Sequence, residues 1–227
     1  EGGGTKTAAA QGVGHSGPVY ATAISPDSRF VLSASRDSTA RLWDAETASN
    51  LVTYRGHNYP VWDVCFSALG HYFVTASHDR TARLWSTDHI YPLRLFAGHL
   101  ASVDCVAFHS NCNYVASGSS DKTCRLWDIT RGDCVRLFKG LRAPVTAVSV
   151  SSCGKLLAAG ADDGMIMVWD LAASKTVNTF KGHTGSVHSV DFSLGGGGLL
   201  ASGGQDGTVR LWDVSGRGGP GADAGVE

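Results

Sequence analysis

The sequence feature that most constrains the fold is an internal repeat, which divides most of this chain into five units. The units start with Gly-His or, in one case, Gly-Leu at residues 14, 56, 98, 140 and 182, so each start lies 42 residues after the one before. Every unit then contains an Asp followed six residues later by a Trp. Self-similarity at such a period indicates a fold built from repeated supersecondary units.

Residues 78–89, HDRTARLWSTDH, illustrate what the repeat excludes. His, Asp, Arg, Ser and Thr are concentrated in this stretch, as they are in many catalytic or metal sites. Asp79 and Trp85, however, have equivalents in the four other units, and a catalytic site is not usually copied five times at a fixed period. We therefore interpret the stretch as one turn and one strand of a structural unit.

Each unit is predicted to contain four short β-strands. In the second unit these cover residues 60–67, 71–77, 80–86 and 91–98, which are rich in β-branched and aromatic residues. Turn-forming sequences such as SPDS at 25–28 separate the segments, and few windows without Gly or Pro are long enough for a helix. The expected fold class is therefore all-β.

Composition narrows the classes of function. The 19 Lys and Arg residues are balanced by 20 Asp and Glu residues, so no basic surface for duplex DNA or an anionic membrane is expected. No run of 18 apolar residues suggests a membrane span. The six cysteines are irregularly spaced and include no Cys-x-x-Cys pair, so we expect reduced thiols in an intracellular protein.

The period and the Gly-His…Trp-Asp pattern of the units resemble WD40 repeats, each of which forms a four-stranded blade of a β-propeller. The resemblance covers residues 14–214 and implies a hydrogen-bonded tetrad of His, Ser or Thr, Asp and Trp inside each blade. The implied tetrads are His15, Ser33, Asp37 and Trp43; His57, Thr75, Asp79 and Trp85; His99, Ser117, Asp121 and Trp127; and His183, Ser202, Asp206 and Trp212. A buried carboxylate requires donors, and such a network would join each turn to its strand.

The fourth unit departs from this pattern. Leu141 stands in place of the His and Ala159 in place of the Ser, whereas Asp163 and Trp169 remain. The unit therefore cannot build the full network, and its Asp has to accept hydrogen bonds from turn amides. We expect the fourth blade to be the loosest of the five.

Five units predict part of a larger ring, because propellers of this type usually have seven blades. Residues 1–13 are a Gly- and Ala-rich leader and residues 215–227 a Gly-rich tail, and both are expected to be flexible. An arc of five blades would expose strand edges. This favours a fragment of a seven-bladed ring over a complete five-bladed one.

The second and third units carry a narrower resemblance. Their segments GHNYPVWD (56–63), GHYFVTASHDR (70–80), PLRLFAGHL (92–100) and HSNCNYVASGSSD (109–121) are similar to the WD-repeat subunits of the general transcription factor TFIID, which in some lineages also serve the SAGA coactivator. The resemblance implies a nuclear, non-catalytic scaffold that supports initiation by RNA polymerase II and binds histone-fold subunits of TFIID or SAGA. It implies no metal, cofactor, small-molecule substrate, membrane or direct nucleic-acid contact.

Partner contacts in such propellers are expected on the top face, at positions three and five after the Gly-His histidine and directly before the tetrad Asp. The candidates are Pro18, Tyr20, Arg36, Pro60, Trp62, His78, Asp104, Asp162 and His188. Tyr20 and Trp62 stand out because aromatic residues dominate interface hot spots. Trp62 could equally cap a strand end against the neighbouring blade, and both roles are left open.

Three other functions make different demands on the sequence. A substrate receptor of a cullin ubiquitin ligase would require several basic top-face residues, and only Arg36 is basic among the candidates. A propeller enzyme would require unrepeated acidic or metal-binding residues at the central channel, and none is evident. A reader of histone tails would require an acidic pocket, for which Asp104 and Asp162 give limited support.

Overall fold

The computed structural model describes residues 12–196 and 198–215, and every regular element within them is a β-strand. The strands form five antiparallel sheets, each a meander in which consecutive strands are neighbours. The prediction of an all-β fold made of repeated sheets is confirmed. The sheets are numbered one to five along the chain.

The strand bounds follow the repeat. The first sheet consists of β1 (Val19–Ile24), β2 (Phe30–Ser35), β3 (Thr39–Asp44) and β4 (Asn50–Arg55). The second consists of β5 (Val61–Phe66), β6 (Tyr72–Ser77), β7 (Thr81–Ser86) and β8 (His89–Ala97). The third consists of β9 (Val103–Phe108), β10 (Tyr114–Ser119), β11 (Cys124–Asp128) and β12 (Cys134–Phe138). The fourth consists of β13 (Val145–Val150), β14 (Leu156–Ala161), β15 (Met165–Asp170) and β16 (Lys175–Lys181), and the fifth of β17 (Val187–Phe192), β18 (Leu199–Gly204) and β19 (Val209–Asp213).

The fifth sheet has three strands within the residues that the structure describes. A fourth strand at the equivalent place would fall within residues 216–227, outside the described residues. Most of the predicted leader, residues 1–13, and tail, residues 215–227, also lies outside them. The seven-bladed ring stays a prediction, since the described residues supply five sheets.

The hairpin between the second and third strands of each sheet turns at the residue directly after the Asp of the unit. That residue has a left-handed backbone in all five sheets, with φ between 66° and 79° at Ser38, Arg80, Lys122, Gly164 and Gly207. The Asp side chain caps the turn: Asp79 Oδ1, for example, accepts the Thr81 amide at 3.0 Å. An Asp that holds its own turn in this way explains why the residue recurs at one place in every unit.

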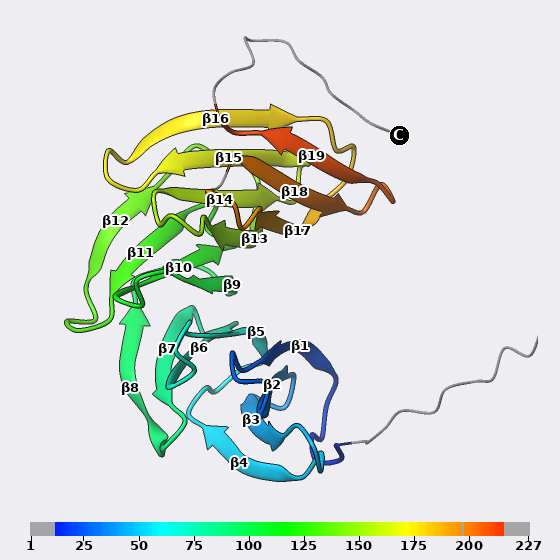
Figure 1. The fold of residues 1–227 in the computed structure, drawn as a ribbon, viewed down its shortest axis with the longest axis vertical. Helices are drawn as coiled ribbons and strands as arrows, with labels where there is room; N and C mark the ends of the chain where they lie inside the picture. Colours follow the sequence, from blue (N-terminus) through cyan, green and yellow to red (C-terminus); the bar gives the residue numbers. More distant parts are fainter. Residues whose placement is uncertain (1–11, 197, 216–227) are drawn as a thin grey trace, which may run out of the picture.

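The five sheets follow one another around an arc (Figure 1). The first strand of each sheet lies nearest the centre of the arc, and the fourth strand, where one is present, lies at its outside. Neighbouring sheets contact one another through their inner strands, from β1 to β5 and onward to β17. The first and fifth sheets are the two ends of the arc.

The hydrophobic core lies between consecutive sheets. We call the side of a sheet that contacts the preceding sheet its leading face, and the side that contacts the following sheet its trailing face. Ala40 and Leu42 on the trailing face of the first sheet pack in one buried cluster with Val61 and Phe73 on the leading face of the second. Equivalent clusters join the other neighbouring sheets.

An aromatic side chain on the fourth strand of each complete sheet extends this core to the Trp of the next sheet. Four such pairs have ring centroids 5.0–5.6 Å apart: Tyr54–Trp85, Phe96–Trp127, Phe138–Trp169 and Phe180–Trp212. Burying one large aromatic side chain contributes roughly 1.5–3 kcal/mol, and the ring contact adds about 1 kcal/mol. Each sheet is thus stabilised chiefly by its neighbours.

Candidate functional site

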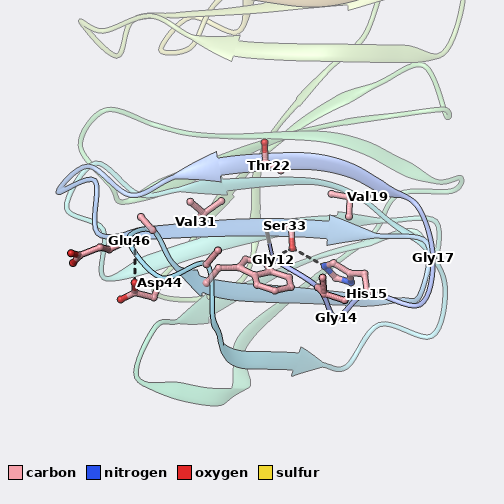
Figure 2. Close-up of a pocket in the computed structure, with 14 residues that line it drawn as sticks. Gly12, Gly14, His15, Gly17, Val19, Thr22, Val31, Ser33, Asp44 and Glu46 are labelled. Carbon is pink, nitrogen blue, oxygen red and sulfur yellow. Dashed lines mark hydrogen bonds between the residues drawn. The ribbon is translucent and has the colours of Figure 1, made fainter. Parts of the chain in front are cut away.

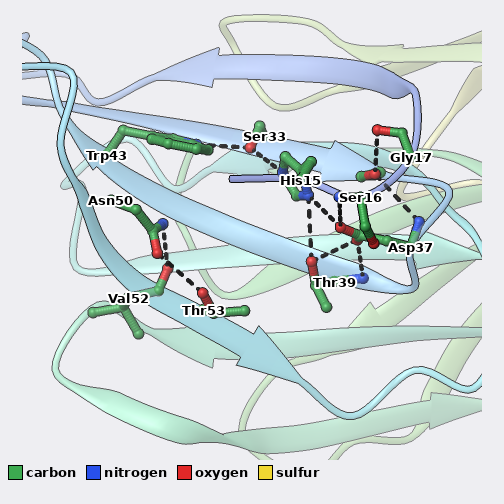
Figure 3. Close-up of polar contacts among 11 residues, drawn as sticks. His15, Ser16, Gly17, Ser33, Asp37, Thr39, Trp43, Asn50, Val52 and Thr53 are labelled. Carbon is green, nitrogen blue, oxygen red and sulfur yellow. Dashed lines mark hydrogen bonds and ion pairs between the residues drawn. The ribbon is translucent and has the colours of Figure 1, made fainter. Parts of the chain in front are cut away.

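A chain of side-chain hydrogen bonds runs through the first sheet (Figure 3). His15 Nδ1 lies 2.8 Å from Asp37 Oδ2, and His15 Nε2 lies 2.6 Å from Ser33 Oγ. Trp43 Nε1 donates to the same hydroxyl oxygen at 2.7 Å. Every group is satisfied when Nδ1–H donates to the carboxylate and the serine hydroxyl donates to Nε2.

The same geometry recurs in the second, third and fifth sheets, with the corresponding distances between 2.7 and 3.0 Å. The residues that the structure brings together there are His57, Thr75, Asp79 and Trp85; His99, Ser117, Asp121 and Trp127; and His183, Ser202, Asp206 and Trp212. Each chain joins the loop before the first strand to the second and third strands.

The carboxylate at the end of each chain is held in its ionised form. Burial alone would raise the pKa of Asp37, but hydrogen bonds from Thr39, His15 and the Ser16 amide hold it well below its ordinary value. The same balance lowers the pKa of Asp79 to about 2. Burial lowers the pKa of His57, which favours the neutral imidazole that the network requires.

The fourth sheet replaces the polar chain by apolar packing. Leu141 and Ala159 are buried in one cluster with Met167 and Trp169. Met167 pairs with Ala159 at the place where the third sheet has Arg125. The Asp of this sheet accepts a hydrogen bond from the amide two residues further on, at 3.2 Å. The lost polar contacts are thus replaced by apolar contacts at several positions together.

These hydrogen-bonded chains have the composition of a Ser–His–Asp catalytic triad but not its geometry. The hydroxyl oxygens of Ser33, Thr75, Ser117 and Ser202 belong to residues that are at most 4 % exposed. Each oxygen lies between an imidazole and an indole nitrogen, whereas a nucleophile must face a substrate. The arrangement supports a structural role in the sheets.

The candidate partner-contact residues gather at one end of the sheets, where the loop before the inner strand meets the turn after the second strand. The Arg36 amide donates to the Pro18 carbonyl at 2.9 Å, and the His78 amide donates to the Pro60 carbonyl at 3.0 Å. Six of the nine candidates are exposed, namely Pro18, Tyr20, Arg36, His78, Asp162 and His188. The other three, Pro60, Trp62 and Asp104, are half-buried.

Three of these candidates join a continuous aromatic surface, which we define as Tyr20, Tyr59, Trp62 and His78. The ring centroids of Tyr20 and Trp62 lie 4.6 Å apart, and the Trp62 and His78 rings meet edge to face at 6.1 Å. Tyr59 contacts His78 at 5.9 Å. Tyr20 and Tyr59 are 44 % and 55 % exposed, so the surface presents aromatic area to a partner.

Trp62 also contacts the third sheet. Its indole nitrogen donates to Ser102 Oγ at 3.0 Å, and Ser102 in turn donates to Asp104 at 2.6 Å. Ser120 Oγ donates to the other Asp104 oxygen at 2.5 Å, and burial raises the Asp104 pKa. Trp62 thus contacts the neighbouring third sheet through its indole N–H, while its half-buried ring belongs to the aromatic surface. Asp104 positions Trp62 indirectly, through Ser102.

Sequence reasoning missed one member of this surface, Tyr59. Tyr59 precedes the positions given by the repeat rule, and its place in GHNYPVWD was the available signal. Asp162, in the turn after β14, and His188, on β17, remain predicted contact residues away from these ring contacts. The aromatic surface therefore lies on the first two sheets.

Within residues 12–196 and 198–215, no three His, Cys, Asp or Glu side chains are grouped so that they could hold a metal ion. The same residues contain no helix of the length and hydropathy that crossing a membrane requires.

Comparison with family models identifies the repeat. The model described as "WD domain, G-beta repeat" matches residues 9–44, 48–86, 90–128, 132–170 and 174–213. The chain belongs to the WD40 family. Each match begins before its Gly-His or Gly-Leu pair and contains the first three strands of one sheet. The four matches after the first also contain the last strand of the preceding sheet.

Curated relatives of this WD40 chain are subunits of transcription complexes. Over 40 residues it is 55 % identical to the "SAGA complex/transcription factor TFIID complex subunit Taf5" of Schizosaccharomyces pombe. Over 43 residues it is 56 % identical to the "Transcription initiation factor TFIID subunit 5" of Arabidopsis thaliana and 54 % identical to that of Drosophila melanogaster. The matches cover 18–19 % of this chain and 6 % of each relative.

Proposed function

We propose that this WD40 chain is a non-catalytic scaffold subunit of TFIID or of a SAGA-like complex and supports initiation by RNA polymerase II in the nucleus. The observation that carries the proposal is the 50–56 % identity to TFIID subunit 5 proteins over short segments. In this fold of repeated sheets, the buried Ser, Thr and His side chains are taken up by structural hydrogen bonds, which agrees with a role in binding other proteins.

The aromatic surface is the proposed point of contact with a partner. Its four side chains span the first and second sheets, and Trp62 is fixed by its hydrogen bond to Ser102 of the third. Rigid, half-exposed aromatic rings lose little conformational entropy on binding and are enriched in interface hot spots. Arg36 and Pro18, joined through their backbones in the first sheet, extend the contact area.

Histone-fold subunits are the proposed partners, because the narrower resemblance of the second and third units implies them. The balanced charge of the chain favours protein partners over direct contact with nucleic acid. The second candidate function is a substrate receptor of a cullin ubiquitin ligase. It is less supported, because Arg36 is the one Lys or Arg among the nine candidate contact residues.

The experiment that tests the proposal is affinity purification of the protein tagged at its own gene, followed by mass spectrometry of the co-purifying proteins. Recovery of TATA-binding protein together with histone-fold subunits supports a TFIID scaffold. Recovery of an acetyltransferase module without TATA-associated factors supports the SAGA-like complex. Recovery of a cullin adaptor and neither transcription complex would refute the proposal and favour the second candidate.

A further inference from the structure

Asp104 of the third sheet places a carboxylate beside the aromatic surface. The repeat itself does not require an acid there, because the equivalent residues of the other sheets are Tyr20, Trp62, Thr146 and His188. Among residues 12–196 and 198–215, no Lys, Arg or His forms an ion pair with Asp104. Its side chain is nevertheless half-buried. A carboxylate that is partly withdrawn from water is stabilised by a positive charge close to it.

Hydroxyl groups hold this carboxylate next to the indole of Trp62. Ser102 Oγ donates to Asp104 Oδ1 at 2.6 Å and accepts the Trp62 indole N–H at 3.0 Å. Ser120 Oγ donates to the other carboxylate oxygen at 2.5 Å. These hydroxyls orient the carboxylate without compensating its charge. A carboxylate has about four acceptor sites, so it can still accept a hydrogen bond from a partner.

His78 connects the carboxylate to the rest of the aromatic surface. Burial raises the pKa of Asp104, and the hydroxyls of Ser102 and Ser120 and the charge of His78 lower it in part. The imidazole of His78 therefore lies within electrostatic range of Asp104, and it also meets the Trp62 ring edge to face. The carboxylate and the aromatic rings form one continuous site over the first three sheets.

We propose that the aromatic surface and Asp104 together bind a positively charged side chain of the partner protein, with arginine favoured over lysine. Aromatic ring faces attract guanidinium and ammonium groups, and the attraction grows when the site is partly shielded from water. A planar guanidinium can stack on a ring while its N–H groups donate to a carboxylate, whereas an ammonium group is a compact, strongly hydrated charge. The inference deepens the proposed function and rests on it for the identity of the partner.

A proline-rich segment is the other ligand that exposed Tyr and Trp rings commonly bind. Such a segment carries no charge for Asp104 to pair with. The carboxylate beside Trp62 is thus the observation that favours a cation, and the proline-rich segment becomes one outcome of the test.

The cavity of about 700 Å³ on the leading face of the first sheet has a different origin (Figure 2). It is lined by Val19, Thr22, Val31 and Trp43 among others. In the second sheet, the equivalent face packs against the first sheet in a buried cluster. The cavity therefore lies where one sheet packs on another elsewhere in this fold, and we assign no ligand to it.

The test is an NMR titration of the purified protein with N-acetyl-arginine methylamide. The matched neutral probe is N-acetyl-citrulline methylamide, which has nearly the same shape and no charge. The reporter is the indole N–H signal of Trp62, assigned by its absence in Trp62→Phe. The indole N–H groups of the tetrad tryptophans donate to Ser or Thr hydroxyls inside the sheets, so their signals report whether each variant is folded.

The proposal predicts that the arginine probe shifts the Trp62 signal saturably, with a Kd between about 1 and 50 mM, and binds at least about threefold more tightly than the citrulline probe. Raising NaCl from about 50 to 500 mM weakens the binding of the arginine probe, because salt screens the charge. Asp104→Asn keeps the size of the side chain and abolishes the preference for arginine. Asp88→Asn is the matched control, because Asp88 is exposed in the turn between β7 and β8, at the other end of β7 from His78.

Four results would overturn the proposal. Neither probe shifts the Trp62 signal up to about 50 mM, both probes bind equally, a folded Asp104→Asn protein keeps the preference for arginine, or an uncharged triproline peptide binds more tightly than the arginine probe. The comparison of the two probes and the salt series need no variant, so they decide the matter if Asp104→Asn is not folded.

The titration uses no partner protein, so its failure is distinguishable from failure of the proposed function. If the arginine probe does not bind but a transcription complex still co-purifies with the protein, the scaffold stands and the arginine site is refuted. If the probe binds but a cullin adaptor co-purifies instead, the site stands and the proposed complex is wrong.

Discussion

Substitution of Ser117 by Ala tests how much the hydrogen-bonded chains stabilise the fold. Ser117 is fully buried and its hydroxyl has two partners, His99 Nε2 and Trp127 Nε1, both at 2.8 Å. Removing the hydroxyl leaves a buried imidazole nitrogen and a buried indole N–H without a partner. An unsatisfied buried polar group costs about 1–3 kcal/mol, so the free energy of unfolding should fall by about 2–4 kcal/mol.

The fourth sheet suggests a variant that restores the loss. Combining His99→Leu, Ser117→Ala and Arg125→Met gives the third sheet the apolar set that the fourth sheet has at Leu141, Ala159 and Met167. Leu in place of His99 removes the imidazole nitrogen that Ser117→Ala alone leaves without a partner, and an apolar group in place of such a buried polar group can be nearly neutral. The triple variant should therefore be more stable than Ser117→Ala alone, although it carries three substitutions.

Thermal unfolding at pH 7, followed by circular dichroism and tryptophan fluorescence, measures both effects. For a chain of this length, about 2–4 kcal/mol corresponds to a decrease in Tm of roughly 5–15 °C. Ser16→Ala is the control, because Ser16 is exposed and contributes its backbone amide to the network. A decrease of less than about 1 °C for Ser117→Ala, or a triple variant less stable than the single one, would refute the reasoning.

Two further predictions concern pH and the hairpin turns. Burial lowers the pKa of His99, and the hydrogen bonds of Asp121, which outweigh its burial, lower the pKa of that carboxyl to about 2. Both groups bind fewer protons in the folded chain than in the unfolded chain, so stability should fall as pH drops below about 6.5 and again between about 3.8 and 2. Burial raises the Asp63 pKa to about 6, which opposes this trend between pH 3.8 and 6. In a series of Tm measurements from pH 8 to 2, the triple variant, which lacks His99, should lose less stability near pH 6 than the unchanged chain. Equal losses of stability in the two proteins would contradict the assignment to His99. Gly164→Ala should destabilise the chain by about 2 kcal/mol or more, because φ is +79° and a Cβ would lie 2.3 Å from the His183 carbonyl oxygen. Gly207→Ala, with φ +76° and open space around it, should cost about 1 kcal/mol in the same denaturation assay, and equal losses at the two glycines would show that the contact is unimportant.

The sequence predicted the sheets well because their turns depend on local chemistry. An Asp that caps a hairpin and a Trp six residues later recur in every unit, and the strands observed in the second sheet begin and end within two residues of the predicted ranges. In the fifth sheet the described residues contain three strands, and the place of a fourth lies outside them.

Contacts between sheets were harder to foresee. Tyr54 packs on Trp85, which lies in the next unit, and nothing in the local pattern shows which residues of neighbouring units meet. Met167 is a similar case, because only the structure shows that it is buried in one cluster with Leu141. Tyr59 joined the aromatic surface through a loop conformation that the repeat rule does not specify.

The measurement that tests the account most directly is quantitative co-purification of partner proteins with the unchanged chain and with variants of the aromatic surface. Trp62→Ala and Tyr59→Ala are compared with Tyr91→Ala, whose side chain is exposed on the second sheet outside that surface. The account predicts that transcription-complex subunits fall at least about tenfold for both surface variants and stay unchanged for the control. Undiminished recovery with folded Trp62→Ala and Tyr59→Ala proteins would contradict it.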